Sequence, residues 1–163
     1  MDSREALRKL RARKEVRDTT LERSRNPLFQ ILKAILAFLG PVLCVYYGNY
    51  YISRNTADVF CRDVFATIDA GKLTEVYKQR SDVALQANET LEQFANRFRN
   101  YETNLGKLQS ATMSAFEIQL VGGAAFVQYD AILSKGVCKY NMVLLRQGLS
   151  GWRLATLVLN VKR

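Results

Sequence analysis

Few residues in this chain could do acid–base or nucleophilic chemistry. The sequence has no histidine, which removes the commonest general base, the usual metal ligand and the Ser-His and Cys-His nucleophile systems. It also lacks a Walker phosphate-binding loop, a dinucleotide-binding glycine motif and a cysteine cluster with zinc-ligand spacing. We therefore expect a protein that is not an enzyme, with no cofactor and no metal site.

The three cysteines are the remaining reactive side chains. Cys44 lies within an uncharged apolar run, where we expect it to act as a small apolar residue. Cys61 and Cys138 lie beyond that run and can form a disulfide if they reach an oxidising compartment. Two cysteines in a domain of this size are also often ordinary core residues. The sequence is therefore compatible with either a disulfide or two buried thiols.

The apolar run itself, residues 34–52, contains no charged side chain. As a helix it would be about 28 Å long at ~1.5 Å per residue, close to the roughly 30 Å of a bilayer's hydrocarbon core. The run therefore predicts one transmembrane helix. The alternatives are a cleavable signal peptide and a buried core helix. The long charged arm and the lack of a small-x-small cleavage site argue against the first, and the uncharged length argues against the second.

The segment before the run, residues 1–33, carries ten basic and five acidic side chains, whereas residues 55–163 carry thirteen and ten. Excess basic charge on one flank predicts a cytoplasmic N-terminal arm and an exported C-terminal domain. We expect the bacterial inner membrane, with an organellar membrane as the alternative. The exported part is only mildly basic, so no nucleic-acid partner is expected, whereas the arm is suited to anionic lipid.

Two residue patterns in and beside the apolar run indicate what it contacts in a membrane. One lysine and four tyrosines are suited to the two membrane interfaces. Small residues line one stripe, which would let another helix approach closely; the plainer explanation is that glycine is tolerated in spanning helices, with Pro41 marking a kink. We expect membrane lipid and other subunits of a membrane complex as partners, and leave a homo-oligomer open. The interface residues are Lys33, Tyr46, Tyr47, Tyr50 and Tyr51, and the stripe is Ala37, Gly40, Cys44 and Gly48.

Beyond the run, the apolar residues recur at helical spacing. A first helix is expected from Asn55 or Thr56, which can cap it, to Gly71, which supplies a left-handed stop. A short second helix follows, and residues 80–89 are expected to be irregular. The residues expected to face the core are Ala57, Phe60, Cys61, Val64 and Ile68 of the first helix, and Leu73, Val76 and Tyr77 of the second.

A third helix is expected to begin at Thr90, because Gln93 is placed to complete a capping box, and to end near Gly106. Its apolar face is the strongest amphipathic signal in the chain. Arg97 and Arg99 on this helix could bind an anion, although such residues are more often the solvated face. The apolar face consists of Leu91, Phe94, Ala95, Phe98, Tyr101 and Leu105.

From about residue 110 onward the sequence predicts strands. Four runs, 111–121, 124–134, 137–147 and 151–161, are separated by glycine-containing turns typical of hairpins. The whole domain is therefore expected to be α+β, with three helices packed on one face of a curved antiparallel sheet of about four strands. The alternating residues expected to share a face are Ala125, Val127, Tyr129, Ala131 and Leu133 in the second run, and Trp152, Leu154, Thr156 and Val158 in the fourth.

This order of elements resembles the nuclear transport factor 2-like (cystatin-like) superfamily, in particular small bacterial domains with the same layout. The resemblance covers about residues 56–162 and depends on residues 68–73, 76–81, 127–131 and 151–154. It implies a cone-shaped domain with a pocket. Members of the superfamily include isomerases, dehydratases, non-catalytic dimers and membrane-anchored scaffolds of secretion machines.

Enzymes of that superfamily place Asp, His or Tyr inside the cone, which makes Asp69, Tyr77, Tyr129 and Asp130 the candidates here. Tyr129 and Asp130 are neighbours on a strand, so at most one of them can point into a pocket. We expect Tyr77 and Tyr129 to line any pocket. The expected function is nevertheless a non-catalytic scaffold or accessory subunit of a membrane complex, and the alternative is a tethered ligand-binding or isomerase-like domain.

Overall fold

The computed structural model describes residues 27–119, 123–148 and 151–161. Most of the basic arm at 1–33 therefore lies outside the described residues. The chain divides into two compact units, Met1–Gly48 and Asn49–Arg163. The second unit begins before Ile52, the residue at which the sequence places the end of the membrane span.

A single helix, α2 (Pro27–Asp69), runs through the boundary between the units. The prediction of a separate helix starting at Asn55 or Thr56 is therefore wrong. The Thr56 hydroxyl does not cap a helix start: it donates to the carbonyl of Ser53 at 3.1 Å and accepts from the indole Nε1 of Trp152 at 3.0 Å. Because neither Gly nor Pro lies between 49 and 56, nothing there interrupts the helix.

The end of α2 is as predicted. Gly71 has φ +73°, a left-handed conformation that side chains rarely adopt, and it follows the last helical residue, Asp69. Next come α3 (Leu73–Glu75) and the π-helical turn η1 (Val76–Arg80), in which Val76 is fully buried.

The expectation that residues 80–89 are irregular is wrong, because they contain the short helix α4 (Val83–Asn88). The Asp82 carboxylate caps it by accepting from the amide of Ala84 at 3.0 Å. Only Leu85 of this six-residue helix is buried. One buried residue gives no repeating apolar pattern from which a helix could be predicted.

Helix α5 (Leu91–Leu105) confirms the predicted third helix and its capping box. The backbone amide of Gln93 donates to the Thr90 hydroxyl, and the side-chain Oε1 of Gln93 accepts from the backbone amide of Thr90 at 2.8 Å. Phe94 and Phe98 are its buried residues. The helix stops at Gly106, where φ is +80° and a Cβ would clash with the Oγ of Ser134, so only glycine fits.

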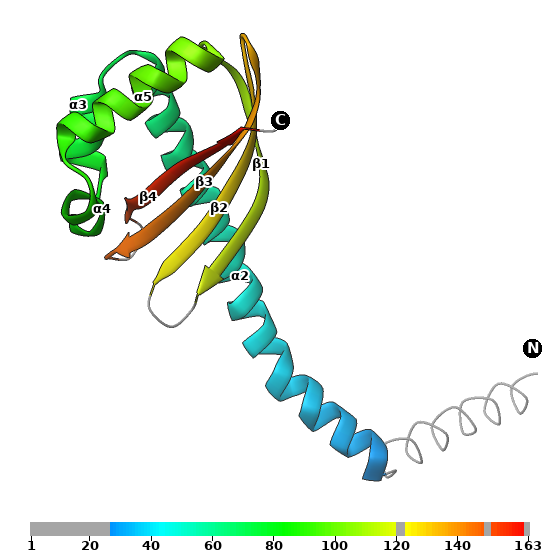
Figure 1. The fold of residues 1–163 in the computed structure, drawn as a ribbon. Coiled ribbons are helices and arrows are strands. Elements are labelled where there is room, and N and C mark those ends of the chain that lie inside the picture. The colour runs from blue at the N-terminus through cyan, green and yellow to red at the C-terminus, as the bar shows by residue number, and fades with distance from the viewer. Residues whose placement is uncertain (1–26, 120–122, 149–150, 162–163) are drawn as a thin grey trace, which may run out of the picture. The chain divides into compact units, whose positions relative to one another are not determined.

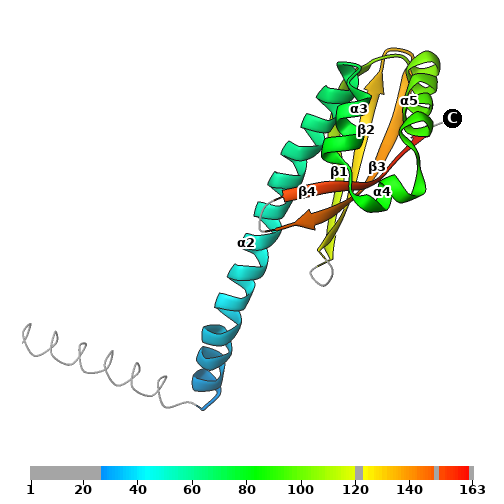
Figure 2. The ribbon, with the colours of Figure 1, turned by 90° about the vertical axis from the view of Figure 1, so that its left-hand side faces the viewer.

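The predicted antiparallel meander is confirmed. The four strands pair in the order β1-β2-β3-β4, each antiparallel to the next (Figure 1). Helices α3, α4 and α5 lie together on one side of the sheet (Figures 1 and 2). The strands are β1 (Leu108–Gln119), β2 (Ala124–Leu133), β3 (Gly136–Gln147) and β4 (Gly151–Val161).

One irregularity reverses part of the predicted face pattern. Thr156 pairs with Val143 but Leu154 pairs with Leu144, so Ala155 is an extra residue in β4. Such a bulge shifts the alternation by one residue. Thr156 and Val158 are consequently exposed, although the sequence placed them with Trp152 and Leu154.

The core forms where the domain's part of α2 meets the inner face of the sheet. Small residues recur every four positions along this face of α2, which lets the helix approach the strands closely. Phe65 then packs against the rings of Tyr129 and Tyr140, with centroids 5.0 and 4.9 Å apart. The small residues are Ser53, Ala57 and Cys61, and all three are fully buried.

We expect Ala57→Leu to destabilise the domain, because added methylenes have no space on this face of α2. Overpacking of this kind typically costs about 1–3 kcal/mol. Urea unfolding can be followed by the fluorescence of Trp152, the only tryptophan of the chain. The matched control is Asn55→Leu at an exposed position on the same helix; equal unfolding midpoints for the two variants would contradict the packing described here.

Candidate functional site

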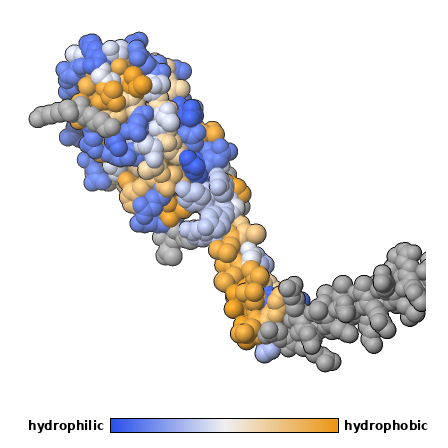
Figure 3. Space-filling model, turned by 90° about the vertical axis from the view of Figure 1, so that its right-hand side faces the viewer, coloured by the Kyte–Doolittle hydropathy of each residue, from blue (hydrophilic) through white to orange (hydrophobic). Residues whose placement is uncertain are grey.

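The first candidate site is the part of α2 in the first unit, residues 27–48. The chain has one described helix that is long and apolar enough to cross a membrane, and none of the residues in its most apolar window is buried. Figure 3 shows this stretch as a largely apolar surface. Lys33 lies over the ring of Phe29, with Nζ 4.8 Å from the centroid. An exposed apolar helix of this length is what a bilayer would cover.

The small-residue stripe lies on this stretch and opens outward. A Cβ built on Gly40 or on Gly48 would meet nothing within 4 Å, and Cys44 is exposed. Pro41 is inside the helix, as expected from the sequence. The stripe therefore has room for a neighbouring helix, and no described residue fills it.

The four tyrosines predicted at the membrane interface do not behave alike. Tyr46, Tyr47 and Tyr51 are exposed. Tyr50 is half-buried within the second unit: its ring packs edge-on against Phe116 at 5.5 Å, and its hydroxyl lies 3.4 Å from the Phe116 carbonyl. The sequence gives no sign of this contact because Phe116 is 66 residues away.

Tyr129 does not line a pocket. Its ring is fully buried beneath α2, and its hydroxyl donates to Asp58 Oδ1 at 2.6 Å. Asp58 in turn pairs with Arg62, whose Nε is 2.9 Å from Oδ2. Burial, followed by the hydrogen bond to Asp58, raises the pKa of Tyr129. Tyr129 therefore ties the sheet to α2 and has a structural role.

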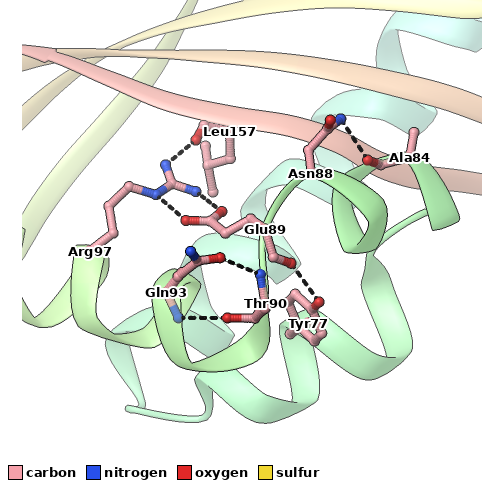
Figure 4. A network of polar contacts seen from close by, with 8 residues as sticks. All are labelled: Tyr77, Ala84, Asn88, Glu89, Thr90, Gln93, Arg97 and Leu157. Atoms are coloured by element: carbon pink, nitrogen blue, oxygen red, sulfur yellow. Dashed lines mark hydrogen bonds and ion pairs between the residues drawn. The ribbon is translucent and has the colours of Figure 1, made fainter.

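Tyr77 also lies outside the pocket in which it was expected. Its hydroxyl donates to the Glu89 carbonyl at 2.6 Å, within the network shown in Figure 4. Of the two candidate aspartates, Asp130 points to the outer face of the sheet, with an oxygen 3.7 Å from Lys139 Nζ. Neither Tyr77 nor Tyr129 borders any of the four cavities described for this domain.

A small cavity does exist between the ends of α2 and α5 and the sheet. Asp69 borders it, together with Tyr101 and Tyr140, two tyrosines that sequence reasoning did not select as pocket residues. Its volume is about 60 Å³, against roughly 300–1,000 Å³ for typical small-ligand sites. Burial raises the pKa of Tyr140, and nearby Cys138 and Asp69 raise it further. The cavity is large enough for a few water molecules.

Arg97 is neither an anion site nor a solvated side chain. Its guanidinium makes a two-point ion pair with Glu89, at 2.8 and 2.5 Å, and donates to the Leu157 carbonyl on β4 (Figure 4). It also lies over the rings of Phe94 and Phe98. Burial alone would lower the pKa of Arg97, but the bond and charge of Glu89 raise it overall. Arg99, by contrast, is exposed, and its guanidinium donates to the side chain of Asn96 on the same helix.

Cys61 and Cys138 are both free and fully buried, so the structure has two core thiols and no bridge between them. Burial raises the pKa of Cys61 to about 12 and that of Cys138 to about 11. At neutral pH both are protonated and therefore poor nucleophiles. Of the two alternatives left open by the sequence, a disulfide or two buried core thiols, this agrees with the buried thiols.

Among the described residues, no group of three or more His, Cys, Asp or Glu side chains is placed to hold a metal ion. Comparison of the chain with protein-family models, with curated proteins and with solved structures gave no match in any of the three. The assignment of function therefore depends on the chain's own geometry.

We expect Arg97→Lys to lower the free energy of unfolding by about 1–2 kcal/mol, because lysine cannot hold Glu89 at two points and also reach the Leu157 carbonyl. Arg99→Lys on the same helix is the control and should change stability by less than about 0.5 kcal/mol. Denaturant unfolding of both variants measures the two changes in free energy. If the two are indistinguishable, the Arg97 network does not contribute to stability.

The buried thiols predict a loss of stability at alkaline pH. Their pKa values are raised in the folded state, so their contribution is complete below about pH 9 and is lost as pH rises toward 11–12. At pH 10 each thiol should lower the free energy of unfolding by about 1 kcal/mol relative to pH 8. Unfolding curves at the two pH values, with Cys138→Ala as comparison, measure this; an unchanged pH dependence in the variant would refute it.

Proposed function

We propose that this protein is a single-pass membrane protein whose exported domain acts as a non-catalytic scaffold or accessory subunit of a larger membrane complex. The observation that carries the proposal is the exposed apolar helix at residues 27–48, joined without a break to a folded α+β domain. A soluble protein would leave this apolar surface in contact with water, whereas a bilayer covers it.

The proposed orientation places the N-terminal arm in the cytoplasm and the domain in the periplasm of a bacterial inner membrane. Its support is the charge difference between the flanks, ten basic side chains in residues 1–33 against one, Arg54, directly after the span. The arm is also suited to anionic headgroups, at about 1 kcal/mol per basic residue near the surface.

We further propose that the domain has the nuclear transport factor 2-like fold, with the helices on the concave side of a curved sheet. Support comes from the order of elements and from a core shared by α2, α5 and one sheet face. The cone would be almost filled: Phe65, Phe98 and Leu133 border a cavity of about 60 Å³. So small a space argues against a substrate or small-ligand site inside the cone.

Two surfaces are suited to protein contacts. Within the span, Gly40 and Gly48 leave the stripe open for close helix packing. On the domain, no helix covers the outer face of the sheet in Figure 1, where Phe126 and Val158 are 42% and 40% exposed. Phe126 and Val158 line one hollow of this face, and a contiguous apolar patch on a folded domain can mark an interaction surface.

We expect enlargement of the stripe, by Gly40→Leu or Gly48→Leu, to remove the protein from its native assembly while the exported domain stays folded. Val42→Leu, at an exposed position on another side of the same helix, is the control. Native gel electrophoresis of gently solubilised membranes reports the assembly, and Trp152 fluorescence reports the fold. Unchanged migration of both glycine variants would contradict packing through the stripe.

A further inference from the structure

The domain's part of α2 has a second face, on the side opposite the sheet. Val59 lies two residues from both Ala57 and Cys61, which are fully buried in the core. At 3.6 residues per turn its side chain therefore points away from the sheet, and it is 62% exposed. In Figure 2 this part of α2 lies at the margin of the domain, with the sheet on its other side. We call this side of α2 the outward face; its residues are Ile52, Asn55, Val59, Arg62 and Ala66, all exposed.

The outward face has the spacing of a seam between two helices. Its five residues are separated by three and four positions in turn, which is the spacing of a coiled coil. Ile52, as exposed as Val59, and Val59 itself occupy equivalent positions seven residues apart. Counting four residues back from Ile52 along the same helix reaches Gly48, a member of the small-residue stripe. The outward face therefore continues the spacing of that stripe beyond the predicted span.

The charged residues at the outward face are already paired within the chain. Arg62 Nε lies 2.9 Å from Asp58 Oδ2, and Asp63 forms an ion pair with Arg80 at 2.9 Å. Two such faces can therefore approach each other without bringing unbalanced charge together. In a parallel helix pair, Arg62 of each helix would also lie beside Asp63 of the other, because a seam residue packs among the residues around its counterpart.

The position of this face indicates what covers it. Val59 is seven residues beyond Ile52, the last residue of the predicted span, which is about 10 Å at ~1.5 Å per residue. Lipid tails therefore do not reach it. In the proposed orientation a second copy of α2 leaves the same membrane at the same residue and in the same direction. Each residue of the outward face then meets its own counterpart, so that apolar Ile52 and Val59 meet apolar partners.

We propose that α2 of two copies of this chain pack in parallel along their outward faces, about a two-fold axis perpendicular to the membrane. Each sheet lies on the far side of its own helix, so the two domains do not obstruct the contact. Such an interface is isologous and closed. The seam is short, but confinement to one membrane raises the effective concentration of the two helices. This pairing rests on the anchor and orientation of the proposed function and names one partner for α2.

The test is disulfide formation by Asn55→Cys in the full chain, in washed membranes and in a Cys44→Ser background, because the other two cysteines are fully buried. Facing residues of closely packed parallel helices fall within the Cα separation that a disulfide allows, roughly 4.4–6.8 Å. We expect mild oxidation to give a dimer of twice 18.6 kDa. Arg54→Cys is the matched control, since it is exposed at the neighbouring position but points about 100° away. It should give about tenfold less dimer.

A charge placed on the outward face gives the second readout. Val59→Glu, made in the Asn55→Cys chain, should reduce cross-linking about tenfold, because two carboxylates would then face each other in the seam. Val83→Glu is the control: it puts the same charge at a valine on α4 that is 76% exposed. This control should leave cross-linking unchanged, and Trp152 fluorescence confirms that both variants are folded.

Four results would each overturn the pairing: no dimer from Asn55→Cys, an equal yield from Arg54→Cys, cross-linking only to a different protein, or no effect of Val59→Glu. The proposed function is read separately in the same samples. A chain that is absent from the washed membranes would overturn the anchor and, with it, the pairing. A membrane-bound chain that forms no dimer overturns the pairing alone.

Discussion

The domain depends on the close approach of one helix to one sheet. Ser53, Ala57 and Cys61 give α2 a face without bulk, and the inner face of the sheet fills the space with the rings of Tyr129 and Tyr140. Two polar contacts fix the position of the helix: Tyr129 with Asp58, and Trp152 with Thr56. Buried polar groups with partners restrict the packing to one arrangement, because any slip leaves them unpaired.

The same helix meets two different requirements along its length. In residues 27–48 apolar side chains are exposed around the helix, as lipid requires. From Asn49 onward one face of the helix is buried against the sheet, and charged residues such as Arg54 and Arg62 are exposed on the other side. The change in side-chain pattern distinguishes residues 27–48 from the domain, although the helix backbone is continuous.

Much of the fold could be predicted because its signals are local. The capping box of α5, the left-handed Gly71 and the glycine turns between strands each act within a few residues. The predictions that failed concern residues whose conformation depends on distant parts of the chain. Thr56 is hydrogen-bonded to Trp152, 96 positions away, and the bulge at Ala155 depends on pairing with β3. Arg97 was ambiguous in sequence for the same reason, because Leu157 is 60 residues further along the chain.

The central claim is that this chain works as a subunit of a larger membrane assembly. The most direct test is extraction of the unmodified full chain from its native membrane in a gentle detergent, followed by size analysis and mass-spectrometric identification of the proteins recovered with it. The account predicts recovery in stoichiometric amounts within an assembly much larger than 18.6 kDa. Recovery only as a free monomer or as a simple homodimer would contradict it.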